Sequence, residues 1–183
     1  MIRAMLWILG AILLGGIVHL STVLVMPQAA TQDAYARLVP LTPVNAMMPL
    51  TAPTAEASIM PFLDPAFAAA VCRYDLSAGA IKLNAPLSQA YTSVTFYTRN
   101  SVAYYAIDDR AAGRRAIELD LMTPEQHAQV LEGEDVTAAD RLIIESPTKT
   151  GLIVLRALAP EPGLMPMARQ ALANAQCRLG PVQ

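Results

Sequence analysis

The N-terminal block of the chain is continuously apolar. From Ala4 to Met26 it contains no Asp, Glu, Lys or Arg. As an α-helix rising about 1.5 Å per residue, this block reaches roughly 34 Å, enough to cross a hydrocarbon core of about 30 Å. We therefore predict a membrane-spanning anchor over residues 1–26.

A cleaved signal peptide is the main alternative for this block. The apolar region of a signal peptide usually has about 7–15 residues, and its cleavage site needs small residues at the first and third positions before the cut. Cleavage after Ala29 or Ala30 would place Pro27 or Gln28 at the third position. These poor sites favour an anchor that is retained.

The charges that flank the helix predict its orientation. Arg3 and the terminal amine precede it, whereas Asp33 comes before Arg37 on the far side. The positive-inside bias therefore favours a cytoplasmic N-terminus in a bacterial inner membrane, with the following domain in the periplasm.

Three residues make the predicted helix a candidate contact surface. Ala11 and Gly15 form a small-xxx-small pair that lets another helix approach closely, and His19 is an ionisable group that can hydrogen-bond to a partner. Glycine is common in membrane helices, so ordinary tolerance of small residues is the alternative interpretation.

Residues 27–60 are predicted to form a linker because proline interrupts them repeatedly. Proline at this density disfavours long helices and central strands. The stretch Asp33–Val39 is compatible with one or two helical turns. The remainder stays apolar at Met47, Met48, Leu50, Ile59 and Met60, so we expect it to lie extended along the domain.

Alternation of apolar and polar positions then predicts a series of short strands. They fall at residues 80–85, 91–98, 102–107, 115–122, 141–145 and 152–158. Arg99-Asn100-Ser101 is predicted to be a hairpin turn in which Asn100 adopts a positive φ. Short strands with turn-like gaps indicate an antiparallel sheet, sandwich-like or barrel-like.

Three helices are predicted around this sheet. Asp64-Pro65 resembles a helix start and predicts a helix to about Cys72, and Thr123 begins a capping box that predicts a helix to about Leu131. A last helix, Met165–Arg178, would deliver Cys177 near its end. The predicted fold class is α+β: a mainly antiparallel, sandwich-like domain over residues 61–183 with flanking short helices.

Composition narrows the function classes. Hydrophobic residues make up 54% of the chain, charged residues only 15%, and the net charge is −2. Basic residues are scattered, so the sequence lacks the basic surface of a nucleic-acid-binding protein. No cofactor-binding or metal-ligand motif is present, and we predict neither a cofactor nor a metal.

The two cysteines, Cys72 and Cys177, match no metal-ligand spacing and no Cys-x-x-Cys redox motif. A disulfide between them is compatible with a periplasmic domain and would close most of the domain into one loop. Two buried free thiols are the alternative, because cysteine often serves as a small core residue.

Aromatic residues gather on two neighbouring predicted strands and form one candidate site. They are Tyr91, Phe96, Tyr97, Tyr104 and Tyr105. They could make a ligand platform with tyrosine hydroxyls as polar groups. Cross-strand aromatic packing, which sheets favour in any case, is the structural alternative.

A charged loop follows these strands. Asp108, Asp109 and Arg110 lie close to Arg114 and Arg115 in sequence, and such groups can bind an anion or a partner. A solvated turn with weak surface pairs is the alternative. We name Asp108 and Arg110 as candidate ligand contacts together with the tyrosines.

Catalytic motifs are missing from the sequence, which contains no Gly-x-Ser-x-Gly, phosphate-binding glycine-rich loop or His-Glu-x-x-His. Outside the apolar block the only histidine is His127, and no metal-ligand partner stands at helical spacing from it. A hydrolase with a scattered site, using Asp108, Asp109 or His127, is therefore the least favoured function.

The segment Tyr74-Asp75-Leu76-Ser77-x-Gly79 precedes the first predicted strand. Asp75 or Ser77 can bond the local backbone, and Gly79 can take a turn conformation. Together with a following apolar strand, a proline and the strand that contains Tyr91-Thr92-Ser93, this segment resembles the bacterial family called domain of unknown function 1254, over roughly residues 60–160.

The resemblance implies a single-pass envelope protein of the short, membrane-anchored type, working beside a companion family, domain of unknown function 1214. It supplies no established catalytic residues. The sequence thus predicts a non-catalytic interaction or assembly module of the cell envelope. The alternative is a binding module for a small apolar or amphipathic envelope ligand that uses the Tyr and Phe strands.

Overall fold

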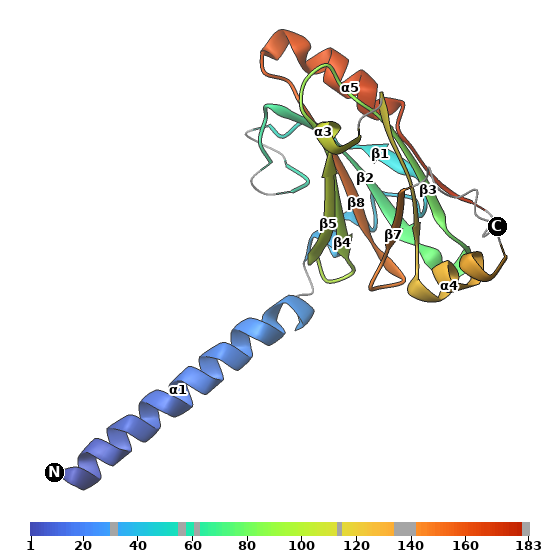
Figure 1. Cartoon of the computed structure of the whole chain (residues 1–183). Coiled ribbons are helices and arrows are strands. Elements are labelled where there is room, and N and C mark those ends of the chain that lie inside the picture. The colour runs from blue at the N-terminus through green and yellow to red at the C-terminus, as the bar shows by residue number, and fades with distance from the viewer. Residues whose placement is uncertain (30–32, 55–57, 61–62, 113–114, 134–141, 181–183) are drawn as a thin grey trace. The chain divides into compact units, whose positions relative to one another are not determined.

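The computed structural model describes residues 1–29, 33–54, 58–60, 63–112, 115–133 and 142–180. The chain divides into two compact units, Met1–Asp33 and Ala34–Gln183. The first unit contains α1, Ile2–Ala29 (Figure 1). Its apolar side chains are exposed, Trp7 to 81%. In length and composition α1 suits a membrane span, and a signal sequence meets the same criterion.

The second unit is built on two β-sheets (Figure 1). The five-stranded sheet has, in spatial order, β1 (Met47–Pro49), β2 (Phe67–Asp75), β8 (Thr150–Leu158), β4 (Thr92–Thr98) and β5 (Ala103–Asp108). The four-stranded sheet has β7 (Leu142–Glu145), β6 (Ala116–Met122), β3 (Ile81–Pro86) and β9 (Gln176–Leu179).

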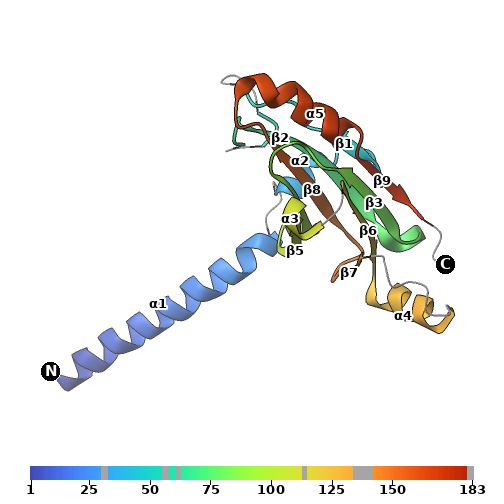
Figure 2. The same cartoon turned by 45° about the horizontal axis from the view of Figure 1, so that its top comes forward.

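Short helices flank the sheets. They are α2 (Ala34–Leu38), η1 (Leu76–Ala78), α3 (Asp109–Ala112), α4 (Pro124–Gly133), η2 (Pro162–Leu164) and α5 (Met165–Ala173). The α5 helix packs on β2 and β8 (Figure 2). Every strand pair is antiparallel except β6 with β7, which is parallel. The predicted α+β class with a mainly antiparallel sheet is confirmed.

The main core lies between the sheets. Alternate residues of each strand point inward, since successive side chains of a strand face opposite sides. On β2 these are Ala68, Ala70, Cys72 and Tyr74. Leu83 of β3 and Leu155 of β8 belong to the same cluster, and Phe96 of β4 is fully buried. The six predicted strands correspond to β3, β4, β5, β6, β7 and β8, with ends shifted by at most two residues.

The first predicted helix is wrong, because Phe67–Asp75 forms β2 instead. The Asp64 carboxylate accepts a hydrogen bond from the Ala66 N–H, and the Asp64 carbonyl accepts one from Phe67, which makes Asp64-Pro65 a turn. The strand then pairs with β8 along its whole length. Its run of small apolar residues suits a strand covered on both faces, and periodicity cannot distinguish such a strand from a short buried helix.

The last predicted helix is too long. The α5 helix ends at Ala173, and Cys177 lies on β9, which pairs with β3. Within α5, Ala168 and Leu172 face the core. Beyond the helix, Ala175 and Cys177 are buried while Gln176 and Arg178 are exposed, which is the two-residue alternation of a strand.

Of two predicted local details, one is wrong and the other is confirmed. In the β4–β5 hairpin Ser101, not Asn100, has the positive φ, at 61°. The capping box at Thr123 is confirmed, because the Gln126 side chain accepts from the Thr123 N–H and the Thr123 hydroxyl accepts from the Gln126 N–H.

Much of the segment predicted as a linker lies inside the second unit, which begins at Ala34. The expected helical turns form α2. The Arg99 guanidinium stacks over the Tyr35 ring of this helix, 4.1 Å from the ring centroid. Buried Leu38 packs with Val71 on the outer face of the five-stranded sheet. Residues 61 and 62, at the predicted start of the domain, lie outside the described residues.

Candidate functional site

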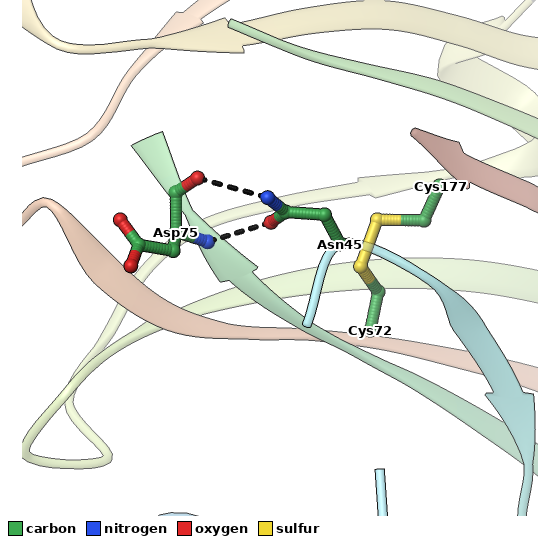
Figure 3. Close-up of a disulfide and its surroundings, with 4 residues drawn as sticks. All are labelled: Asn45, Cys72, Asp75 and Cys177. Atoms are coloured by element: carbon green, nitrogen blue, oxygen red, sulfur yellow. Dashed lines mark hydrogen bonds between the residues drawn. A yellow bond between two sulfur atoms is a disulfide. The ribbon is translucent and has the colours of Figure 1, made fainter. Parts of the chain in front are cut away.

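The Asp75 region joins the N-terminal segment to the sandwich. The Asn45 side chain accepts a hydrogen bond from the Asp75 N–H and donates one to the Asp75 carbonyl, at 2.7 and 3.1 Å (Figure 3). The Asp75 carboxylate accepts from the Ser77 N–H. Gly79 has φ 146°, which favours glycine. The Asp75-x-Ser77-x-Gly79 turn is therefore structural.

Tyr74 is the buried centre of a hydroxyl cluster. Its hydroxyl lies 2.9 Å from the Ser146 hydroxyl and 3.2 Å from the Tyr104 hydroxyl, and it donates to the Tyr97 carbonyl. Burial raises the pKa of Tyr104 far above its usual range. A Cβ at Gly151 would lie 2.3 Å from the Tyr74 hydroxyl, so only glycine fits there. The hydroxyl of Tyr104, which was predicted to contact a ligand, is thus already hydrogen-bonded inside the domain.

A disulfide joins Cys72 of β2 to Cys177 of β9 and so connects the two sheets (Figure 3). Their Cα atoms are 6.3 Å apart, and the two cysteines lie 105 positions apart in sequence. The bond closes one edge of the sandwich, where β1 also approaches β9. Together with the apolar N-terminal helix, it indicates a secreted or cell-envelope location.

The aromatic residues do not form one platform. Phe96 is fully buried and packs against the rings of Tyr104 and Tyr105, with centroids 6.2 and 6.0 Å apart. Tyr105 remains 37% exposed at the free edge of the five-stranded sheet. Tyr91 and Tyr97 instead line two different hollows on the outer face of that sheet.

An apolar hollow lies on the outer face of the five-stranded sheet, and we call it the outer groove. It holds about 380 Å³ and is bounded by β2, β8, α2, α5 and residues 50–53. Its wall includes Leu38, Leu50, Val71, Tyr97, Leu152 and Val154. Arg156 and Arg169 also line it.

A more polar hollow continues from the outer groove, since Phe67 and Arg156 line both. Tyr91 and Asp108, two of the predicted contacts, come together here with Ser93 and Thr95. Register explains the gathering, because Ser93 of β4 pairs with Arg156 on one side and with Asp108 on the other.

The remaining charged candidates are dispersed. Asp108 accepts a hydrogen bond from the Ala111 N–H and so begins α3, on which Arg110 is exposed. Arg114 lies outside the described residues. His127 of α4 contacts the Glu145 carboxylate of β7 at 2.7 Å. Within the described ranges no group of three or more His, Cys, Asp or Glu side chains could hold a metal ion.

The predicted contact residues of α1, namely Ala11, Gly15 and His19, are exposed on the helix. A Cβ added at Gly15 would meet no atom within 4 Å. Thr22 donates its hydroxyl to the Val18 carbonyl one turn earlier, so it is satisfied within the helix.

A family model described as "Protein of unknown function (DUF1254)" matches residues 44–179. The chain belongs to the DUF1254 family. The match begins at the segment that Asn45 fixes to β2 and ends at the last residue of β9, so it excludes α1. The resemblance that Tyr74–Gly79 suggested is confirmed. A search of curated proteins gives no match for this DUF1254 chain.

Two crystal structures share the fold of this family member. The VPA0106 protein from Vibrio parahaemolyticus has a TM-score of 0.58 at 11% identity, covering 79% of this chain and 33% of its own. An uncharacterized protein from Burkholderia cenocepacia has a TM-score of 0.51 at 14% identity, covering 80% of this chain and 37% of its own. The DUF1254 chain thus spans about a third of each solved protein's length.

Sequence reasoning missed the outer groove and its two arginines. One signal was available for Arg156, because it is the only charged residue in the otherwise apolar strand Thr150–Leu158. Arg169 gave no comparable signal, since an exposed arginine on a short amphipathic helix is common.

Proposed function

We propose that this DUF1254 chain is a membrane-tethered extracytoplasmic module that binds a partner protein at its β5 edge. The observation that carries the proposal is the unprotected edge itself. From Ala103 to Ile107 the strand has no charged residue and no proline, and Ala103, Tyr105 and Ala106 are exposed. Edge strands without such protection are templates for pairing with another chain.

The other three edges differ from β5. The β1 strand has three residues and ends in Pro49, and the β7 and β9 strands have four residues each. The β5 strand has six, and from Tyr105 to Asp108 it keeps a regular register with β4. Among the described residues, β5 is therefore the longest of the four edge strands, and its outer backbone groups can pair with an added strand.

A protein of the companion family 1214, expected from the resemblance, is one candidate for the partner at the β5 edge.

The length of the apolar run in α1 supports the tether. From Ala4 to Met26 it has no charged residue and is longer than the usual apolar region of a signal peptide, and Arg3 precedes it. Intact mass spectrometry of the protein extracted from membranes should give the full chain of 19.6 kDa. A chain that starts near Ala30 would show cleavage and remove the tether.

The partner can be tested through its dependence on the β5 edge. We expect the full chain, solubilised in mild detergent, to run as a complex heavier than one chain, and Ala103→Lys to convert it to the single chain. Ala173→Lys is the matched control, because it places the same charge at an exposed alanine on α5. A wild-type monomer, a dimer of identical chains, or equal loss in both variants would contradict the proposal.

A further inference from the structure

The outer groove has the properties of a ligand site. Its volume of about 380 Å³ lies at the lower end of the range of about 300–1,000 Å³ that is typical of small-molecule sites. The wall combines the sheet face at Val71, Leu152 and Val154 with Leu38 of α2 and Leu50. This apolar wall favours hydrocarbon over a polar solute.

Two guanidinium groups border the apolar wall. Arg156 comes from β8 and Arg169 from α5, and both residues are exposed. For the described part of the chain, neither guanidinium has an ion-pair or hydrogen-bond partner. Asp64 also lines the groove, but one of its carboxylate oxygens accepts a hydrogen bond from the Ala66 N–H. The groove therefore offers two unpaired cations beside a hydrocarbon-lined space.

We propose that the outer groove binds a fatty acid, with its single acyl chain on the apolar wall and its carboxylate at Arg156 and Arg169. Guanidinium groups bind carboxylates through strong, charge-assisted hydrogen bonds. The small volume suits one acyl chain rather than the two of a phospholipid. Each methylene that leaves water raises affinity about fourfold, so chain length adds to the recognition of the head group.

The polar hollow beyond Arg156 limits how far the chain extends. Ser93 and Thr95 contribute hydroxyl groups to this hollow, and Asp108 contributes a carboxylate, one oxygen of which accepts a hydrogen bond from the Ala111 N–H. These groups disfavour hydrocarbon. Arg156 therefore marks the boundary at which the carboxylate lies. This inference concerns the sheet face and does not depend on a partner at the β5 edge.

The test uses the full chain in phosphatidylcholine nanodiscs and a palmitate probe with a photoreactive diazirine in its chain. After irradiation, peptide mapping should place the label on the segments that line the groove, in residues 50–71 and 150–158. Replacing both groove arginines, Arg156→Gln and Arg169→Gln, should lower this labelling about tenfold, the loss expected for charge-assisted contacts.

The control variant is Arg178→Gln, which removes an exposed arginine from β9 on the other sheet. It should label as the wild type does. Ala69→Trp places a large ring in the groove wall and should block the label while the melting profile shows a folded domain.

Three results would overturn the proposal. The first is label confined to α1. The second is equal groove labelling by the matching diazirine alcohol, which lacks the carboxylate, or undiminished labelling in the double arginine variant. The third is loss of the label when phosphatidylglycerol is added to the discs, since this would show that a two-chain phospholipid occupies the groove.

Discussion

The two lateral edges of the sandwich are built differently. On one side, β1 approaches β9 and the Cys72–Cys177 disulfide joins the two sheets. On this side the Asn45 side chain also accepts a hydrogen bond from the Asp75 N–H at the end of β2. On the other side, β5 and β7 end their sheets, and Tyr105 is left 37% exposed beside buried Phe96. We call these the closed side and the open side.

We therefore expect the closed side to contribute mainly to stability and the open side mainly to association. Covalent and hydrogen-bonded links constrain the closed side, so substitutions there should act mainly on the free energy of unfolding. The open side has exposed apolar residues and unpaired strand groups, so substitutions there should act mainly on association.

The largest expected effect comes from removing the disulfide. The double variant Cys72→Ala and Cys177→Ala should lower the free energy of unfolding by about 4–5 kcal/mol, because the bond closes a loop of roughly a hundred residues. Pulse proteolysis in urea can measure this change, whereas tryptophan fluorescence cannot, since the single tryptophan is Trp7 of α1. A loss below about 1 kcal/mol would mean that the bond does not constrain the domain.

Removing the Asn45 side chain should have the next largest effect on the closed side. Asn45→Ala leaves the Asp75 N–H and carbonyl without these partners, and we expect a loss of about 1–3 kcal/mol in urea unfolding. Asn84→Ala is the matched control, because Asn84 donates to the Glu118 carboxylate at an exposed site. Equal effects of the two variants would contradict a special role for Asn45.

On the open side, Tyr105→Ala should have a smaller effect on stability. The variant loses an edge-to-face contact with Phe96, worth about 1 kcal/mol. The same unfolding assay measures it. A loss above about 3 kcal/mol would show that Tyr105 is a core residue, and the open side would then not be available to a partner.

The smallest effect concerns pH. Hydrogen bonds from the Ser77 hydroxyl and N–H, with nearby Arg73, hold the pKa of Asp75 below its ordinary value. Because the pKa is depressed in the folded state, the stabilisation is complete above the unfolded pKa and is lost as the pH falls through the folded pKa. Asp75→Asn should unfold with a shallower acid dependence than the wild type, and parallel curves would contradict this assignment.

The sequence predicted those elements whose pattern is local. Alternation identified β3, β4 and β6, and the Thr123–Gln126 capping box identified the start of α4. The β2 strand was missed because it is covered on both faces, which removes the alternation. The β9 strand was missed because its four residues directly follow α5 and only pairing with β3 defines them.

The candidate site was less predictable. Tyr91 and Asp108 do meet in the polar hollow, but through a register across three strands that local pattern cannot supply. Tyr104 was named for its hydroxyl, which is already bonded in the cluster around Tyr74. The outer groove depends on the packing of α2 and residues 50–53 over the sheet, which is a tertiary feature.

The central claim, that the open side binds a partner, is tested most directly by photocrosslinking in living cells. A benzophenone amino acid would replace Tyr105 on the open side or Arg178 on the closed side, both exposed. The account predicts one protein adduct from position 105, lost when Ala103→Lys is added, and none from position 178. Equal adducts from both positions, or none from position 105, would contradict it.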